Sequence, residues 1–177
     1  MKNNIRWFYM IIGVVAMLFA GVLYAWSILK APLLTEFGWG PSELALNFTL
    51  AMTFFCIGGL LGAQISKKAG HKLAIISAGV LSALGFILTA LLHNAGVWML
   101  YITYGVLAGL GIGIAYKVVI ATVSAWFPDK KGLCSGALMM GFGVSTLLLG
   151  NVISILFENE NFGFSKAYIT LGVVIGI

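Results

Sequence analysis

Apolar and polar positions follow one another along this chain in long blocks. Apolar runs are separated by short segments rich in charge, proline and glycine. A run of about 18 or more apolar residues predicts a membrane-spanning helix, because a helix rises about 1.5 Å per residue across a hydrocarbon core of about 30 Å. The pattern therefore predicts an all-α membrane protein. The predicted helices cover about residues 7–29, 42–65, 73–92, 97–127, 132–156 and 165–177.

The last of these runs is short. It begins near Ser165 and reaches Ile177 with too few residues to cross a membrane comfortably. A complete protein seldom ends inside an apolar helix without a polar tail, so we expect this helix to be incomplete and the chain to be part of a longer one. A short protein that ends here is the alternative.

The basic residues sort by side when the helices alternate from a cytoplasmic N-terminus. The inner segments then hold seven of them and the outer segments two, which is the bias that the positive-inside rule describes. The pattern predicts a multi-pass protein of the plasma membrane with a cytoplasmic N-terminus. The inner residues are Lys2, Arg6, Lys67, Lys68, Lys72, Lys130 and Lys131, and the outer ones are Lys30 and Lys166.

Composition agrees with a membrane solvent. Only 8% of the residues are charged, with 61% hydrophobic and a mean hydropathy of +1.07, whereas a soluble domain is about 25% charged. The net charge of +5 raises the question of nucleic acid, but the basic residues lie in short loops, so no nucleic-acid partner is expected. Cys56 and Cys134 stand in separate runs without C-x-x-C spacing and predict neither a disulfide framework nor a metal site.

Lys117 is the one basic residue deep inside a predicted span. A lysine at the bilayer centre costs about 2.5–3.5 kcal/mol on insertion scales, which favours a position facing an interior or a water-filled cavity. Helical spacing places Gly113, Lys117, Ala121 and Ser124 on one small, weakly polar face. Two interpretations stay open. Lys117 faces an anionic substrate or titrates, or it pairs with a backbone carbonyl and is structural.

Other polar residues give weaker signals. Tyr24 and Asn47 are candidates to line a polar interior, although such residues often only bond between membrane helices. Gly105, Gly109 and Gly113 recur every four residues, a spacing that lets membrane helices approach closely. No span carries paired carboxylates, a Ser/His pair or a metal-ligand cluster, so we predict no enzyme activity and no cofactor.

Several short segments resemble those of one transporter family. The matching segments are RWFY at 6–9, GVLYAWS at 21–27, GIGIAY at 111–116, WFPDKKGL at 126–133, SG at 135–136 and GFG at 141–143. In their order they are similar to the N-terminal half of the oxalate/formate antiporter-like subfamily of the major facilitator superfamily. The resemblance implies a six-helix half of a transporter, with the C-terminal six-helix half as the missing partner.

The resemblance also implies site residues, with some departures. Tyr24 matches a pocket aromatic residue of the family, and Phe142 stands where the family has a tyrosine. In the gating turn between the second and third helices, Gly70 matches a family glycine and Lys68 the basic residue. Lys67, however, takes the place of an acidic residue. Lys117 stands where a small or neutral residue is usual.

The function implied is secondary transport by alternating access in the lipid bilayer. The expected substrate is a small organic anion such as oxalate, formate, pyruvate or lactate. We expect Tyr24, Asn47, Lys117 and Phe142 to contribute to substrate binding. A half-size membrane subunit that acts structurally or by dimerisation, without transport of its own, is the alternative.

Overall fold

The computed structural model describes residues 2–92, 96–158 and 163–176, and these residues form helices joined by short turns. Two segments inside the apolar runs have tighter or wider winding than an α-helix: η1 is a 3₁₀-helix and η2 a π-helix. The elements are α1 (Lys2–Ala20), η1 (Gly21–Ala25), α2 (Trp26–Phe37), α3 (Pro41–Ala69), α4 (His71–Ala90), α5 (Val97–Leu100), η2 (Tyr101–Ala108), α6 (Gly109–Ala125), α7 (Lys131–Glu158) and α8 (Gly163–Gly176).

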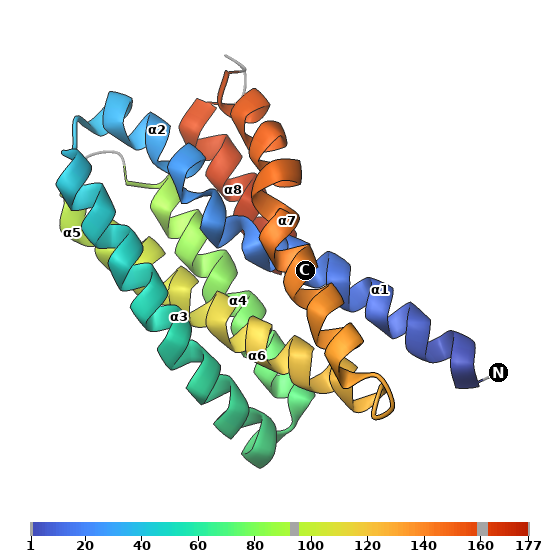
Figure 1. Ribbon diagram of the computed structural model, residues 1–177. Coiled ribbons are helices and arrows are strands. Elements are labelled where there is room, and N and C mark those ends of the chain that lie inside the picture. The colour runs from blue at the N-terminus through green and yellow to red at the C-terminus, as the bar shows by residue number, and fades with distance from the viewer. Residues whose placement is uncertain (1, 93–95, 159–162, 177) are drawn as a thin grey trace.

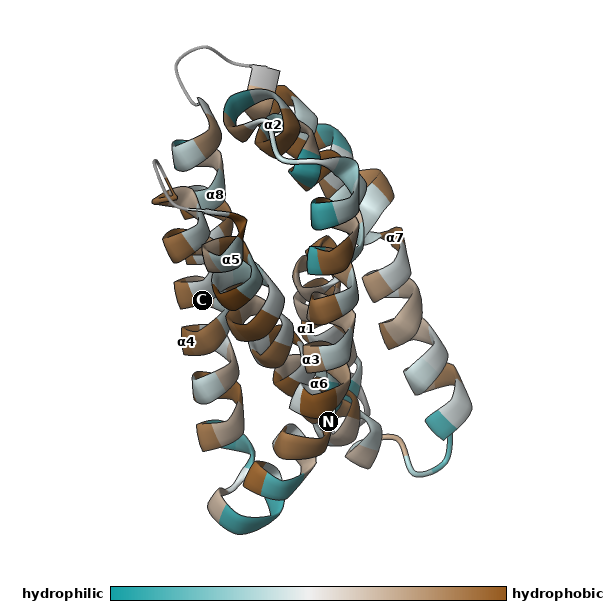
Figure 2. Cartoon of the chain, turned by 90° about the vertical axis from the view of Figure 1, so that its left-hand side faces the viewer, coloured by the Kyte–Doolittle hydropathy of each residue, from teal (hydrophilic) through white to brown (hydrophobic). Residues whose placement is uncertain are grey.

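Among the described residues, five continuous helical runs are long and apolar enough to cross a membrane. The α3–α4 turn, the α6–α7 turn and the N-terminus lie toward one end of the bundle (Figure 1). Hydrophilic residues gather mostly at the two ends, with apolar residues between them (Figure 2). The five runs are Ile5–Phe37, Pro41–Ala69, His71–Ala90, Val97–Ala125 and Lys131–Phe157, and Gly163–Gly176 is a shorter apolar helix.

The first helical run is longer than the sequence predicted. It continues past residue 29 to Phe37, although Pro32 lies inside it. A proline in a helix interior costs about 3 kcal/mol, but Leu29 and Leu33 on either side are fully buried, and their packing offsets that cost. The helix ends instead at Gly38, whose φ of 64° is the left-handed conformation that favours glycine.

The other helices depart from the predicted ranges by at most a few residues at their ends. The largest difference is at the end of α3, which runs four residues past its predicted end to Ala69, so that Lys67 and Lys68 lie in its last turn. The others are within the usual fraying of helix termini. The predicted helix over 165–177 corresponds to α8, and Ile177 lies outside the described residues.

The helices α3 and α6 pack at glycines. A Cβ added to Gly109 would lie 2.7 Å from the carbonyl oxygen of Ala51, and one on Gly113 would meet the backbone of Phe55. Real Cβ atoms do not approach backbone so closely, so only glycine permits this helix separation. The four-residue glycine spacing therefore serves close packing, as the sequence indicated.

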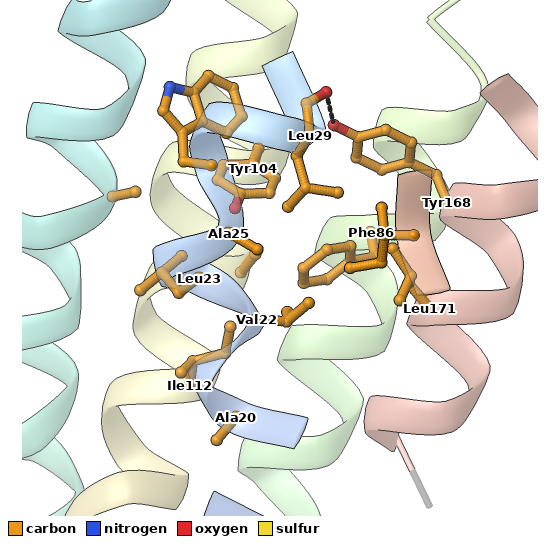
Figure 3. Close-up of a cluster of buried hydrophobic side chains, with 14 of the residues drawn as sticks. Ala20, Val22, Leu23, Ala25, Leu29, Phe86, Tyr104, Ile112, Tyr168 and Leu171 are labelled. Carbon is orange, nitrogen blue, oxygen red and sulfur yellow. Dashed lines mark hydrogen bonds between the residues drawn. The ribbon is translucent and has the colours of Figure 1, made fainter. Parts of the chain in front are cut away.

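Aromatic and aliphatic side chains fill the centre of the bundle (Figure 3). Phe86 of α4 packs edge-on against Tyr104 of η2, with ring centroids 5.4 Å apart. The hydroxyl of Tyr168 on α8 donates a hydrogen bond of 2.9 Å to the carbonyl oxygen of Leu29 on α2. This bond satisfies a buried polar group and ties α8 to α2.

Candidate functional site

Four aromatic side chains from four helical segments meet in one cluster, which we call the aromatic cluster. Its members are Tyr24 on η1, Phe55 on α3, Tyr116 on α6 and Phe142 on α7. Phe142 is its centre, with ring centroids 5.1 Å from Tyr24, 5.1 Å from Tyr116 and 5.9 Å from Phe55. Tyr24 is 47% exposed, so the cluster has an open side.

The structure thus brings together two of the predicted binding residues, Tyr24 and Phe142, and adds two that sequence reasoning missed. Tyr116 carried a signal, because it ends the GIGIAY segment and directly precedes Lys117. Phe55 carried none. It is one of many phenylalanines in apolar runs, and only the packing distinguishes it from a side chain that faces lipid.

Local winding positions Tyr24. The 3₁₀ segment η1 lies where α1 and α7 approach each other, and a Cβ on Gly21 would lie 2.6 Å from the Cβ of Ser145 on α7. Glycine at this point lets the backbone of η1 come close to α7. Since Tyr24 follows Gly21 by three residues and Phe142 precedes Ser145 by three, the same contact places the two rings together.

Asn47 lies elsewhere. It is fully buried on α3, and neither its amide oxygen nor its amide nitrogen has a hydrogen-bond partner. A Cβ added to Gly105 would lie 3.1 Å from Oδ1 of Asn47, so the side chain packs against the π-helical segment η2. A buried polar group without a partner costs about 1–3 kcal/mol, and π-helical turns often occur at functional positions. Asn47 is thus a buried group with unused hydrogen-bonding capacity.

Lys117 is exposed and lines a groove with two residues of the α3–α4 turn, Lys67 and His71. We call this the basic groove. It has a volume of about 350 Å³, and its other lining residues are Ala63, Ser66 and Ala121. The structure therefore associates Lys117 with the predicted gating turn, while Tyr24 and Phe142 belong to the aromatic cluster.

The predicted face of α6 is divided in the structure. Lys117 and Ala121 line the basic groove, as their spacing indicated, but Gly113 is buried against Phe55 of α3. Gly113 is on the predicted face but is covered by α3, because α6 contacts α3 directly at that turn. The groove opens only one turn further along α6.

The other two residues of the predicted gating turn, Lys68 and Gly70, do not line the groove. Gly70 has a φ of 87°, which side chains rarely adopt, and it separates α3 from α4. Lys68 is exposed and is not among the residues that line the groove. Among the described residues, no group of three or more His, Cys, Asp or Glu side chains gathers to hold a metal ion.

Two of the sequence segments noted above pack on each other at the same end of the bundle. Arg6 donates hydrogen bonds of 3.0 and 3.2 Å to the two carboxylate oxygens of Asp129. Its guanidinium carbon also lies 5.2 Å from the ring centroid of Phe127, and the ring of Trp7 contacts Phe127 at 5.5 Å. The start of α1 and the α6–α7 turn therefore form one structural unit.

The comparisons with known proteins agree with this architecture. The pattern of the Major Facilitator Superfamily matches residues 9–177, and the chain belongs to that family. The chain is 30% identical over 173 residues to the oxalate:formate antiporter of Oxalobacter formigenes, covering 97% of this chain and 40% of that protein. It is 28% identical over 169 residues to the uncharacterized MFS-type transporter YhjX of Escherichia coli strain K12, covering 96% and 41%.

A third relative comes from an animal. The chain is 36% identical over 127 residues to monocarboxylate transporter 12 of Mus musculus, covering 68% of this chain and 24% of that protein. This chain spans about 40% of the length of the two relatives that it matches over nearly its whole length. With five helices of membrane-spanning length among its described residues, it is a multi-pass membrane protein of the Major Facilitator Superfamily.

Proposed function

We propose that the chain is the N-terminal half of a secondary active transporter for small carboxylates such as oxalate, formate, pyruvate or lactate. The observation that carries this proposal is the similarity, over 97% of the chain, to a protein named as an oxalate:formate antiporter. The similarity to a monocarboxylate transporter supports the same substrate class. The transporter resides in the plasma membrane with its N-terminus in the cytoplasm, in agreement with the positive-inside distribution.

Alternating access requires two halves that rock about a site near the middle of the membrane. In this proposal the aromatic cluster supplies part of one wall of that site. Aromatic faces and edges exclude water, and the hydroxyls of Tyr24 and Tyr116 are potential donors to a carboxylate. Phe142 brings no hydroxyl, so this wall has fewer donors than one with a tyrosine there. Asn47 contributes its unpaired amide when the half rearranges.

Lys117 supplies positive charge to the same half. A small carboxylate entering from the α3–α4 end passes the basic groove, where Lys117 and Lys67 raise the local anion concentration. Because the groove and the aromatic cluster are separate, we assign attraction to Lys117 and enclosure to the aromatic residues.

Uptake of labelled oxalate and labelled formate by the full-length transporter in proteoliposomes tests this proposal. Lys117→Ala should lower the uptake rate at low substrate concentration. Tyr116→Ala should lower it at all concentrations, because it opens the wall of the site. Lys72→Ala is the matched control, since it removes a nearby positive charge that does not line the groove. Unchanged transport by Lys117→Ala would remove this residue from the proposed mechanism.

A half-size membrane subunit without transport of its own is the second candidate, and it is motivated by the chain's 40% coverage of its relatives. A single six-helix half has no opposite wall, so the 177-residue chain alone should show no saturable uptake. Suppose that this chain alone shows saturable uptake and is a dimer in size-exclusion chromatography. That result would favour transport by a pair of copies, over both the half of a longer transporter and the subunit without transport of its own.

A further inference from the structure

The basic groove concentrates positive charge without a matching acid. Lys67 lies in the last turn of α3, His71 begins α4 and Lys117 comes from the middle of α6, so three helices bring basic side chains to one hollow. None of the residues that line the groove is acidic. Among the described residues, no carboxylate lies within ion-pair distance of Lys67 or Lys117.

Two further observations at the same place point to a ligand. The hydroxyl oxygen of Ser66 is buried and has no hydrogen-bond partner, although it belongs to a residue that lines the groove. The helix α4 starts at His71 without a side-chain cap, and its first backbone hydrogen bond runs from Ala74 to Gly70 over 3.3 Å. The N–H groups before Ala74 therefore lack helical acceptors, and the positive end of the helix dipole lies beside the groove.

These features suit one ligand chemistry. An ammonium group binds an oxyanion as a compact point charge, a hydroxyl donates one hydrogen bond to it, and a helix N-terminus adds amide donors and positive potential. The groove offers two ammonium groups, one hydroxyl and one uncapped helix start. Its volume of about 350 Å³ accommodates a carboxylate or phosphate group of a few heavy atoms.

We propose that the basic groove is an oxyanion-binding site, separate from the aromatic cluster, in which Lys67, Lys117 and Ser66 hold a phosphate- or carboxylate-type group. The bound oxyanion neutralises the charge that the protein itself leaves unpaired. Its source is either a free small anion or the headgroup of an anionic lipid, since Lys67 and His71 lie at the end of the bundle where headgroups are expected. This inference rests on the proposed function for the role of Lys67 and Lys117 as attracting groups, but binding is measured on the protein alone, so its failure is distinguishable from a failure of transport.

Equilibrium binding of inorganic phosphate and of oxalate to the purified protein, at low ionic strength in neutral detergent, tests the proposal. We expect Lys67→Ala and Lys117→Ala each to weaken binding roughly threefold to tenfold, because each removes a charge-assisted contact. The double variant should show no saturable binding. Lys117→Arg should retain it. Lys72→Ala is the matched control and should bind as the parent protein does.

To distinguish a free anion from a lipid headgroup, the phosphate titration is repeated with the protein in nanodiscs of phosphatidylcholine and in nanodiscs of phosphatidylglycerol. Phosphate binding that persists in phosphatidylcholine and disappears in phosphatidylglycerol identifies a lipid headgroup as the competing occupant. Equal binding in both identifies a free anion, and both results support the oxyanion site. Absence of binding to the parent protein in every condition, or an equal loss with Lys72→Ala and Lys67→Ala, overturns it. These side chains are exposed, so their replacement leaves the helix packing intact.

Discussion

The α6–α7 turn and the α3–α4 turn lie toward the same end of the bundle and are both basic, yet they are built differently (Figure 1). In the α6–α7 turn, Asp129 binds Arg6 at 3.0 Å, and Phe127 is fully buried and contacts the ring of Trp7. In the α3–α4 turn, Lys67 and its basic neighbours surround an open groove. One turn is internally neutralised, whereas the other exposes its charge to whatever binds there.

The difference depends on few residues. The α6–α7 turn has one acid and a second chain segment, the start of α1, that covers it. The α3–α4 turn has a lysine where the resemblance to the major facilitator superfamily implies an acid, and among the described residues no other segment supplies one. Two basic turns therefore have different structures: the α6–α7 turn is packed against the start of α1, whereas the α3–α4 turn borders a candidate binding site.

The largest expected effect comes from breaking the packed turn. Phe127→Ala removes a fully buried ring that contacts Arg6 and Trp7. Such a change costs about 3–5 kcal/mol in protein cores, and we expect the low end here, because one neighbour is partly exposed. The free energy of unfolding in mixed detergent micelles measures it.

The control for this prediction comes from the open turn. Leu73 on the first turn of α4 is 55% exposed, so Leu73→Ala should change the free energy of unfolding by less than about 0.5 kcal/mol. Equal losses in the two variants would contradict the contrast between the turns.

The second prediction tests whether the basic groove reflects the α3–α4 turn itself or loose packing of α3 on α6. Gly113→Ala places a methyl group against the backbone of Phe55, so α3 and α6 must move apart. Overpacking of this kind typically costs about 1–3 kcal/mol. Gly136 on α7 has no atom within 4 Å of an added Cβ, and Gly136→Ala should be neutral or stabilising. If the two variants change the free energy of unfolding equally, α3 packs loosely on α6, and this loose packing is the reason for the groove.

Much of the fold follows from hydrophobic patterning, because a span must be apolar over a fixed length whatever its neighbours are. The pattern did not reveal that the helix would pass Pro32, since that depends on the burial of Leu29 and Leu33 against other helices. It also gave no reason to select Phe55. Spacing along one helix cannot show which turn of that helix meets a neighbour, so it did not reveal that α3 covers Gly113.

For the candidate site, the sequence identified the unusual residue but not its companions. Lys117 was singled out because a charge inside an apolar run is costly, and that argument needs no structure. Its association with Lys67 and His71 depends on how α6 packs against the last turns of α3 and the start of α4. Phe142 came from the family resemblance and Tyr24 from both its polar character and that resemblance, and the structure places their rings in contact.

A third prediction concerns how much the ion pair between Arg6 and Asp129 stabilises the α6–α7 turn. The side chains of Arg6 and Asp129 are 22% and 47% exposed, so their ion pair is only partly screened. A double-mutant cycle with Arg6→Gln and Asp129→Asn should give a coupling energy of about 0.5–1 kcal/mol that decreases at high salt. A coupling near zero would leave the aromatic contacts as the reason for the closed turn.

The smallest expected effect comes from giving the α3–α4 turn an acidic residue, such as the α6–α7 turn already has. Lys67→Asp puts a carboxylate into the basic groove, where it faces the ammonium of Lys117 and the uncapped start of α4. We expect a gain of about 0.2–0.5 kcal/mol in the free energy of unfolding, because exposed ion pairs contribute little. The gain should vanish in the Lys67→Asp, Lys117→Ala double variant, whereas Lys68→Asp should show no dependence on Lys117.

Because the new carboxylate occupies the place of a bound oxyanion, phosphate binding should be lost in Lys67→Asp even though the protein is slightly more stable. A variant that gains stability and still binds phosphate would show that the charge of Lys67 does not define the site.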